Sequence, residues 1–149
     1  MKKISVLIPC YNEEENVVPI SEAVIGIITK ELPQYDYELV FIDNDSTDKT
    51  RELLRMLCAK NPKIKAIFNA RNFGQFNSPY YGILQVTGDC VISMVADFQD
   101  PVEMIPSEMP MEQAGAAVPV SEPIFVEEPA EPFAEVAGVI PVDERTNAP

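Results

Sequence analysis

A short polar segment, Asp97 to Asp100, carries oxygen-bearing side chains of the kind that hard divalent cations bind. Mg²⁺ and Mn²⁺ prefer such oxygens and usually share their coordination sphere with substrate phosphates. A metal held between Asp97 and a diphosphate would neutralise the charge that develops on a leaving group. A solvated loop is the favoured interpretation on this feature alone, because the Asp-Pro pair at 100–101 is typical of the start of a turn.

Three other side chains have the chemistry to contact a nucleotide. Asp43 ends an apolar run and can accept hydrogen bonds from base N–H groups or ribose hydroxyls, or it can cap the next helix. Tyr11 can stack on a base, or pack over the edge of a sheet. Arg71 can reach a phosphate or a base edge, or form a surface ion pair. For each of the three residues, the sequence leaves both the ligand-binding role and the structural role open.

The composition removes several other functions. The chain of 149 residues has no His, which excludes a His-dependent catalytic triad and a zinc site built on His. Its net charge of −13 opposes binding to nucleic acid. The three cysteines show no C-x-x-C spacing and indicate reduced thiols in the cytoplasm, and no apolar run is long enough to span a bilayer. Neither G-x-G-x-x-G nor G-x-x-x-x-G-K-[ST] occurs.

Apolar patterning predicts the elements that position these residues. Short apolar runs predict strands at 4–8, 37–42, 64–68 and 90–95. Helical spacing predicts a helix at 12–30, with Asn12 and Glu15 resembling a capping box. A second helix is expected after a cap at Ser46 or Thr47, and a third at 74–86.

Strands that alternate with helices predict an α/β fold with a mostly parallel, Rossmann-like sheet. Right-handed crossovers give the strand order 3-2-1-4, with helices on both faces. Ligands of such sheets bind beyond the carboxyl ends of the strands, where the chain order reverses. The segments expected at that place are 9–12, 43–45 and 97–100.

The last part of the chain has a different composition. Residues 108–149 contain nine acidic residues, one basic residue and seven of the 14 prolines. Proline removes backbone donors and interrupts regular elements. We therefore expect a domain at 1–107 followed by an acidic, Pro- and Ala-rich, disordered tail at 108–149.

Taken in order, several segments resemble family 2 glycosyltransferases of the GT-A fold. They are SVLIPCYNEEEN (5–16), FIDNDSTDKT (41–50), ARNFG (70–74), TGD (87–89) and ADFQDP (96–101). The nearest branch is that of polyprenyl-phosphate and dolichyl-phosphate sugar transferases, including enzymes that modify lipopolysaccharide. The resemblance covers about residues 3–105.

This resemblance implies transfer of a sugar from a UDP- or GDP-linked nucleotide-diphospho-sugar, with Mg²⁺ or Mn²⁺ as the cofactor. It places Pro9, Tyr11, Glu13, Asp43 and Arg71 around the nucleotide. It makes Asp97 the last Asp of the D-x-D motif and Gln99 a second metal-binding residue, while Val95 stands where the first Asp is usual. Asp100 is a substitute catalytic base for a hydroxyl acceptor. Asn44 and Asp45 replace the common Asp-Gly pair.

Family members continue well past this point, so we expect a truncated chain, a shifted reading frame or an artificial join near residue 107. A genuine short protein with an unrelated tail is the other possibility. Two alternatives to a working transferase remain open. One is a non-catalytic, nucleotide-binding remnant, and the other is a protein-interaction module that acts through the acidic tail. Exposed apolar surface on a partial domain would favour homo-oligomers. A lipid-phosphate acceptor in cell-envelope synthesis would place the protein in the cytoplasm, peripherally at the inner face of the membrane.

Overall fold

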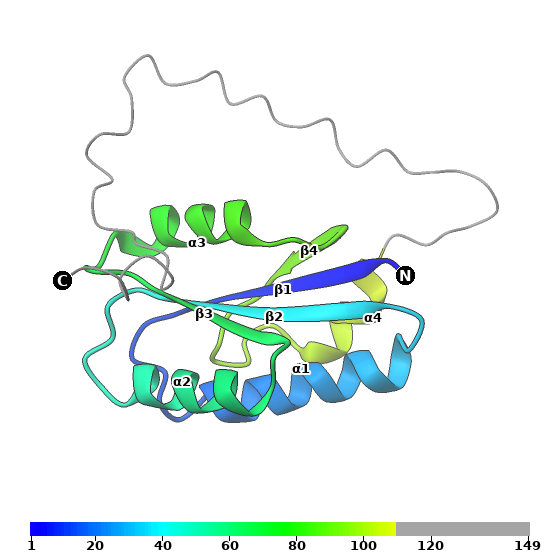
Figure 1. Cartoon of the computed structure of the whole chain (residues 1–149), viewed down its shortest axis with the longest axis horizontal. Coiled ribbons are helices and arrows are strands. Elements are labelled where there is room, and N and C mark those ends of the chain that lie inside the picture. The colour runs from blue at the N-terminus through cyan, green and yellow to red at the C-terminus, as the bar shows by residue number, and fades with distance from the viewer. Residues whose placement is uncertain (110–149) are drawn as a thin grey trace, which may run out of the picture.

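The computed structural model describes residues 1–109 and contains a sheet of four parallel strands in that range. The strands are β1 (Lys3–Cys10), β2 (Asp36–Asp43), β3 (Ile64–Phe68) and β4 (Cys90–Ser93), in the order β3-β2-β1-β4 (Figure 1). This confirms the predicted class and strand order. Apart from its first two residues, the predicted acidic tail lies outside the described residues.

The register brings the carboxyl ends of three strands level with one another. Cys10 at the end of β1 pairs with Asp43 at the end of β2, and Asp43 pairs with Phe68 at the end of β3. Strand β4 pairs with β1 only as far as Ser93, which lies opposite Leu7. The loops that follow β1, β2 and β3 therefore start side by side.

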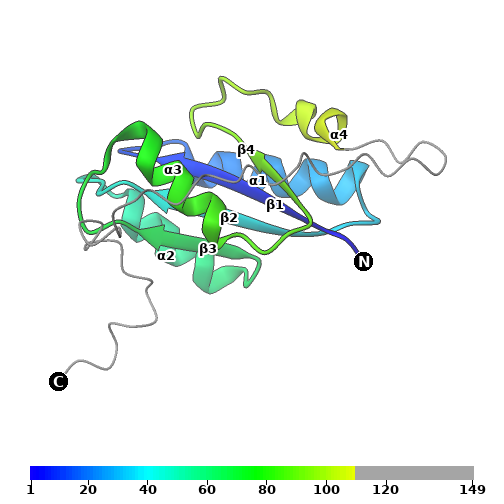
Figure 2. The ribbon, with the colours of Figure 1, turned by 90° about the horizontal axis from the view of Figure 1, so that it is seen from above.

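Helices cover both faces of the sheet, as predicted. Helices α1 (Val17–Glu31) and α2 (Thr50–Lys60) lie on one face, while α3 (Gly74–Gln85) lies on the other (Figure 1). A short 3₁₀ helix η1 (Val102–Met104) and α4 (Ile105–Glu108) pack beside α1. From above, α3 runs over the sheet, and it contacts β1 and β2 (Figure 2).

Alternating side chains of the central strands supply two unequal cores. The α1–α2 face holds the larger core, which includes Ile4, Val6, Ile8 and Phe41, all with no exposed surface. The α3 face holds a small core of Leu7, Val40 and Ile42. This period of two is what a strand buried on both faces requires.

Three predicted boundaries were wrong. Helix α1 begins at Val17 instead of residue 12, and its N-cap Asn16 makes no side-chain capping bond. Helix α2 begins at Thr50, after a longer loop than expected, and β4 ends at Ser93 instead of residue 95. Asn12 does not cap a helix because its backbone has a φ of 52° and its side chain accepts hydrogen bonds from the loop after β2.

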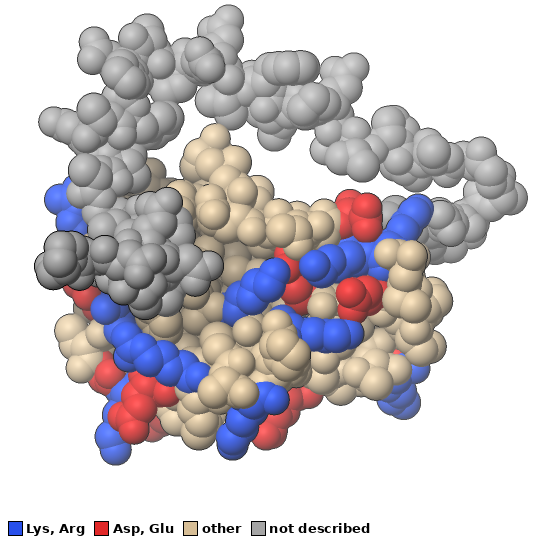
Figure 3. All heavy atoms as spheres, in the orientation of Figure 1, with Lys and Arg blue, Asp and Glu red and all other residues tan. Residues whose placement is uncertain are grey.

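A buried carboxylate, Glu38 on β2, fastens the turn before β4 to the sheet. Ser5 Oγ donates to Glu38 Oε1 at 2.6 Å, and the Thr87 backbone N–H donates to the same oxygen at 2.6 Å. Lys65 Nζ lies 2.5 Å from Oε2. Figure 3 shows basic and acidic side chains interspersed on the viewed face.

Candidate functional site

A cavity of about 650 Å³ opens beyond the carboxyl ends of β1 and β4. Its wall is formed by the end of β1, the loops after β2 and β3, the first turns of α3, and residues 93–97 after β4. It lies where the chain order of a parallel sheet reverses, the usual place for a ligand in such folds. A nucleotide-sized ligand fits a cavity of this size.

Four of the residues predicted for the site line this cavity: Pro9, Tyr11, Glu13 and Asp97. The Tyr11 side chain is 48% exposed, so its ring is free to receive a flat ligand. The structure thus brings together residues that are far apart in the chain. Their roles in binding remain predictions.

Asp43, by contrast, is fully buried and is not among the residues that line the cavity. Its Oδ2 lies 2.6 Å from Arg51 Nε and accepts a hydrogen bond from the Ser46 backbone N–H at 3.2 Å. Its Oδ1 is buried without a hydrogen-bond partner among residues 1–109. An unpaired buried carboxylate oxygen is costly, and this atom could accept a donor from a ligand only after a side-chain movement brings it to the cavity.

Arg71 also lies apart from the cavity lining. Its side chain is exposed, and its guanidinium carbon lies 4.9 Å from the centre of the Phe73 ring. This cation–π contact keeps it next to the loop that precedes α3. A movement of the side chain would be needed for the predicted phosphate contact.

The predicted metal-binding segment is ordered by its own hydrogen bonds. Gln99 donates to both oxygens of Asp97, from its backbone N–H at 3.2 Å and from Nε2 at 2.7 Å. Asp100 accepts from the Val95 backbone N–H at 3.1 Å, and it lines a separate hollow of about 90 Å³. Asp97 and Asp100 therefore line different depressions.

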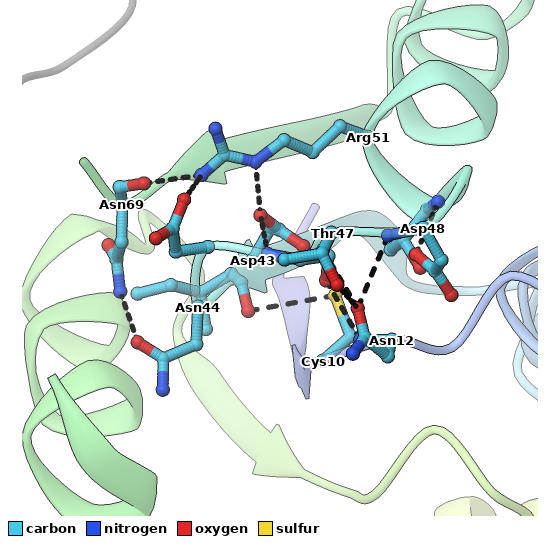
Figure 4. Close-up of polar contacts among 12 residues, drawn as sticks. Cys10, Asn12, Asp43, Asn44, Thr47, Asp48, Arg51 and Asn69 are labelled. Carbon is cyan, nitrogen blue, oxygen red and sulfur yellow. Dashed lines mark hydrogen bonds and ion pairs between the residues drawn. The ribbon is translucent and has the colours of Figure 1, made fainter. Parts of the chain in front are cut away.

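Two asparagines of the segments expected at this place, to which the sequence analysis gave no role in binding, hold the loops of the site. Asn12 Oδ1 accepts from the backbone N–H groups of Thr47 at 2.8 Å and Asp48 at 3.4 Å, which ties the loop after β1 to the loop after β2 (Figure 4). Asn44 Oδ1 accepts from the Phe73 backbone N–H at 2.8 Å, and its Nδ2 donates to Asn72 Oδ1 at 2.9 Å. Asn44 thereby shapes the part of the cavity wall that the loops after β2 and β3 form.

The Cys10 thiol lines the cavity but is not a nucleophile. Burial raises its pKa well above the usual value, and the nearby carboxylates of Asp43 and Glu13 raise it further, against a smaller opposing effect of Arg51. A thiol with a raised pKa holds little of the reactive thiolate at neutral pH. The sequence also contains no His that could act as a base to activate the thiol.

Comparison with known proteins decides the family. The family model described as "Glycosyl transferase family 2" matches residues 5–133. The chain belongs to glycosyl transferase family 2. The match extends beyond residue 107, where the sequence analysis placed the end of the domain.

Two curated relatives are named for bactoprenol or undecaprenyl phosphate. The chain is 38% identical over 114 residues to a bactoprenol glucosyl transferase of Shigella phage SfX, covering 76% of this chain and 37% of that protein. It is 43% identical over 108 residues to an undecaprenyl-phosphate 4-deoxy-4-formamido-L-arabinose transferase of Photorhabdus laumondii, covering 71% and 32%. The chain therefore spans about a third of the length of these two relatives.

Solved structures of glycosyltransferases share the fold. S. aureus TarS (residues 1–349) in complex with UDP-GlcNAc matches with a TM-score of 0.52 and 26% identity, over 64% of this chain and 26% of that chain. A mannosyltransferase from Pyrobaculum calidifontis in complex with GDP-Man and Mn²⁺ matches with a TM-score of 0.56 and 24% identity, over 69% and 30%. The second likeness shows the fold alone.

Asp97 is a single carboxylate ligand of the kind that a divalent cation can share with a substrate phosphate. Within residues 1–109, no group of three or more acidic or cysteine side chains could hold a metal ion. Asp97 nevertheless offers a carboxylate on the cavity wall, and Mg²⁺ or Mn²⁺ often takes only one or two protein carboxylates together with substrate phosphates and water. Val95, which lines the same wall, has no ligating atom.

Proposed function

We propose that this chain carries the donor-binding part of a glycosyltransferase that moves a sugar from a nucleotide-diphospho-sugar to a polyprenyl phosphate. The observation that carries the proposal is the cavity at the switch point of the sheet, with Tyr11, Glu13 and Asp97 on its wall. The names of the relatives support the lipid-phosphate acceptor, because two of them name bactoprenol or undecaprenyl phosphate. Cell-envelope glycan synthesis is the process that such an acceptor implies.

The donor site combines stacking with polar recognition. Tyr11 stacks on the base, and Pro9 and Glu13 line the space beside it. The unpaired Asp43 Oδ1 accepts a base N–H once the nucleotide is bound. Arg71 does not line the cavity in this structure, and in this proposal its side chain turns from the Phe73 ring toward the diphosphate. The donor is UDP- or GDP-linked in this proposal.

Asp97 holds Mg²⁺ or Mn²⁺, and Gln99 both orients the Asp97 carboxylate and offers its amide oxygen. When bound, such a cation neutralises the charge that develops on a departing diphosphate. The two hydrogen bonds from Gln99 leave lone pairs on both Asp97 oxygens, so the carboxylate can be held in place and still bind a ligand.

A polyprenyl phosphate is already ionised near neutral pH and needs no strong base. Asp100 would serve as the base only for a hydroxyl acceptor, and its place in a separate hollow argues against that role in this conformation. No helix within the described residues is long and apolar enough to cross a membrane. We propose that the chain works in the cytoplasm, peripherally at the inner face of the membrane where its acceptor is anchored.

Calorimetric titration of UDP and then GDP, with and without Mn²⁺, tests this proposal. We expect binding of one of the two that depends on Mn²⁺ and is weakened at least tenfold in Asp97→Ala, since loss of even the residues that support a metal ligand costs about 10–100-fold in metal affinity. Glu103→Ala is the matched control, because Glu103 is an exposed carboxylate of η1 that does not line the cavity. Equal binding by wild type and Asp97→Ala would reject the metal site.

Measurements of nucleotide binding and of sugar transfer on the 149-residue chain separate the two alternatives, the non-catalytic remnant and the module that acts through the acidic tail. A remnant would bind the nucleotide but transfer no sugar to a polyprenyl phosphate, whereas a module acting through the acidic tail would bind no nucleotide. We propose that residues 108–149 are dispensable for nucleotide binding, so deletion of that segment should leave the affinity unchanged. If the deletion variant folds but no longer binds the nucleotide, the nucleotide-binding domain extends past residue 107. That result would agree with the family match, which reaches residue 133.

A further inference from the structure

We propose that Arg51 is a positioning residue that sets the base preference of the donor site. It holds Asp43 so that the unpaired carboxylate oxygen meets the N–H edge of a nucleobase. The inference rests on the proposed function, because it assumes a nucleoside diphosphate donor. It concerns a residue on α2 that neither lines the cavity nor contacts the predicted metal ligands.

Arg51 joins two of the loops that follow the strands. Its Nε lies 2.6 Å from Asp43 Oδ2, and one of its terminal nitrogens donates to the backbone carbonyl of Asn69 at the end of β3. The same nitrogen lies 3.5 Å from Asp45 Oδ1. Figure 4 shows the guanidinium between the Asp43 and Asn69 segments. A planar guanidinium has the donors in a fixed fork that this bridging needs.

Both buried side-chain oxygens that lack a partner belong to residues that Arg51 holds. Within residues 1–109 these atoms are Asp43 Oδ1 and Asn69 Oδ1. Asp43 has no exposed surface and Asn69 is 1% exposed, so bulk solvent reaches neither oxygen. Since buried polar atoms are normally paired, two acceptors left open at one place indicate a ligand that brings N–H donors.

Asp43 is next to residues that form the cavity wall. Asp43 pairs in register with Cys10 on one side and is followed in the chain by Asn44, and both of these neighbours line the cavity. Arg51 occupies Asp43 Oδ2 from the side of α2. The carboxylate is therefore held at Oδ2 and unpaired at Oδ1. Because Asp43 has no exposed surface, the inference requires a side-chain movement at the cavity wall that brings Oδ1 to the ligand.

The hydrogen-bonding chemistry of the Asp43 carboxylate would discriminate between nucleobases. A carboxylate only accepts hydrogen bonds. Uracil N3–H and guanine N1–H are donors, whereas cytosine N3 and adenine N1 present lone pairs that a carboxylate repels. Without Arg51, Asp43 Oδ2 keeps only the longer hydrogen bond from the Ser46 backbone N–H, so the carboxylate is held less firmly toward the base. Arg51 thereby acts on specificity without touching the ligand.

The test is a calorimetric comparison of UDP, GDP, CDP and ADP, each with Mn²⁺, on the full 149-residue chain. Ribose and diphosphate are the same in all four, so affinity ratios isolate the base. We expect wild type to prefer UDP or GDP over CDP and ADP by about tenfold or more, as a hydrogen bond to a charged group predicts. Arg51→Gln should bring this ratio close to one, and Arg51→Lys should give an intermediate ratio.

Arg55→Gln is the matched control. Arg55 lies on the same helix and over the same Phe68 ring, at 4.8 Å against 5.6 Å for Arg51, but has no ion pair with Asp43. It should keep the wild-type ratio. A wild-type ratio in Arg51→Gln, or an equal loss of affinity for all four nucleotides, would overturn the inference.

Two further outcomes are decisive. If Arg51→Gln gives no cooperative thermal transition, Arg51→Lys decides, and an unchanged ratio in that variant would count against the inference. If folded wild type binds none of the four nucleotides, the proposed function fails and the inference fails with it. Nucleotide binding with an Arg51-independent ratio would reject the inference and leave the proposed function standing.

Discussion

Two buried carboxylates on β2, five residues apart, differ in how completely they are paired. Glu38 has both oxygens satisfied, by Ser5, Thr87 and Lys65. Asp43 has one oxygen bound to Arg51 and one oxygen open. A fully paired buried carboxylate stabilises the fold, whereas a half-paired one is available for a ligand. Both carboxylates are buried, so burial does not distinguish them. The number of hydrogen-bond partners on each carboxylate oxygen does.

The pairing of Glu38 predicts a loss of stability in acid. Burial by itself would raise the pKa of the Glu38 carboxyl, but hydrogen bonds from Lys65, Ser5 and the Thr87 backbone outweigh it and lower the pKa to about 2. Because the folded-state pKa is depressed from 4.5, the stabilisation is complete above pH 4.5 and is lost as the pH falls toward 2.

Urea unfolding of wild type and Glu38→Gln measures this effect. At pH 7 we expect wild type to be more stable by up to about 3 kcal/mol, and the difference should shrink steadily between pH 4.5 and 3. Glu22→Gln, on the exposed face of α1, should change stability little at either pH. A difference between wild type and Glu38→Gln that does not vary with pH would contradict the assignment.

At the scale of elements, the turn between α3 and β4 packs directly on β1. A Cβ added at Gly88 would lie 2.4 Å from Ser5 Oγ, 2.8 Å from the Ser5 backbone nitrogen and 2.9 Å from the Lys3 carbonyl oxygen. Two of these atoms belong to the backbone of a central strand and cannot move aside. Glycine at 88 is therefore required by close approach, since any side chain would separate the turn from the sheet.

Because an added Cβ would meet backbone atoms at Gly88 and nothing at Gly26, we expect opposite effects of Gly→Ala substitution on stability at the two positions. Gly88→Ala should destabilise the chain by about 3 kcal/mol, at the upper end of the usual cost of overpacking. Gly26→Ala, in the exposed part of α1 with no described atom within 4 Å of the new Cβ, should stabilise it by about 1 kcal/mol through helix propensity. Denaturant midpoints of the two variants check both signs, and a neutral Gly88→Ala would show that the turn can move.

At the scale of the whole molecule, residues 1–109 cover the α3 side of the sheet only thinly. Helix α3 exposes Phe76 (79%) and Leu84 (62%), and within residues 1–109 β4 pairs on only one side, with β1. The α1–α2 face, in contrast, has a large continuous core. Exposed apolar side chains beside an open strand edge favour association with another protein surface.

We therefore expect the chain to self-associate through the α3 side. Sedimentation velocity over a range of concentrations should show oligomers, and Leu84→Glu should weaken the association about tenfold, the equivalent of one apolar side chain kept out of an interface. Met56→Glu is the control, because Met56 is exposed on α2, on the opposite face. Monomeric wild type at all concentrations would contradict this expectation.

The amino-acid sequence alone determined the strands, their order and the gathering of Pro9, Tyr11, Glu13 and Asp97 at one end of the sheet. Apolar runs are local, and right-handed crossovers leave little choice of topology once the elements are known. The same local signals failed at Asn12, which resembles a helix cap but accepts its hydrogen bonds from residues about 35 positions away.

Tertiary structure alone decided which polar residues pair with one another. No spacing rule connects Arg51 to the Asn69 carbonyl, or Asn44 to the Phe73 backbone N–H, because these contacts exist only once β2 and β3 lie side by side. It also separated Asp100 and Arg71 from the cavity that Asp97 lines. Residue type limits the chemistry that a side chain can do, but the partners supplied by neighbouring strands determine which atoms remain free to do it.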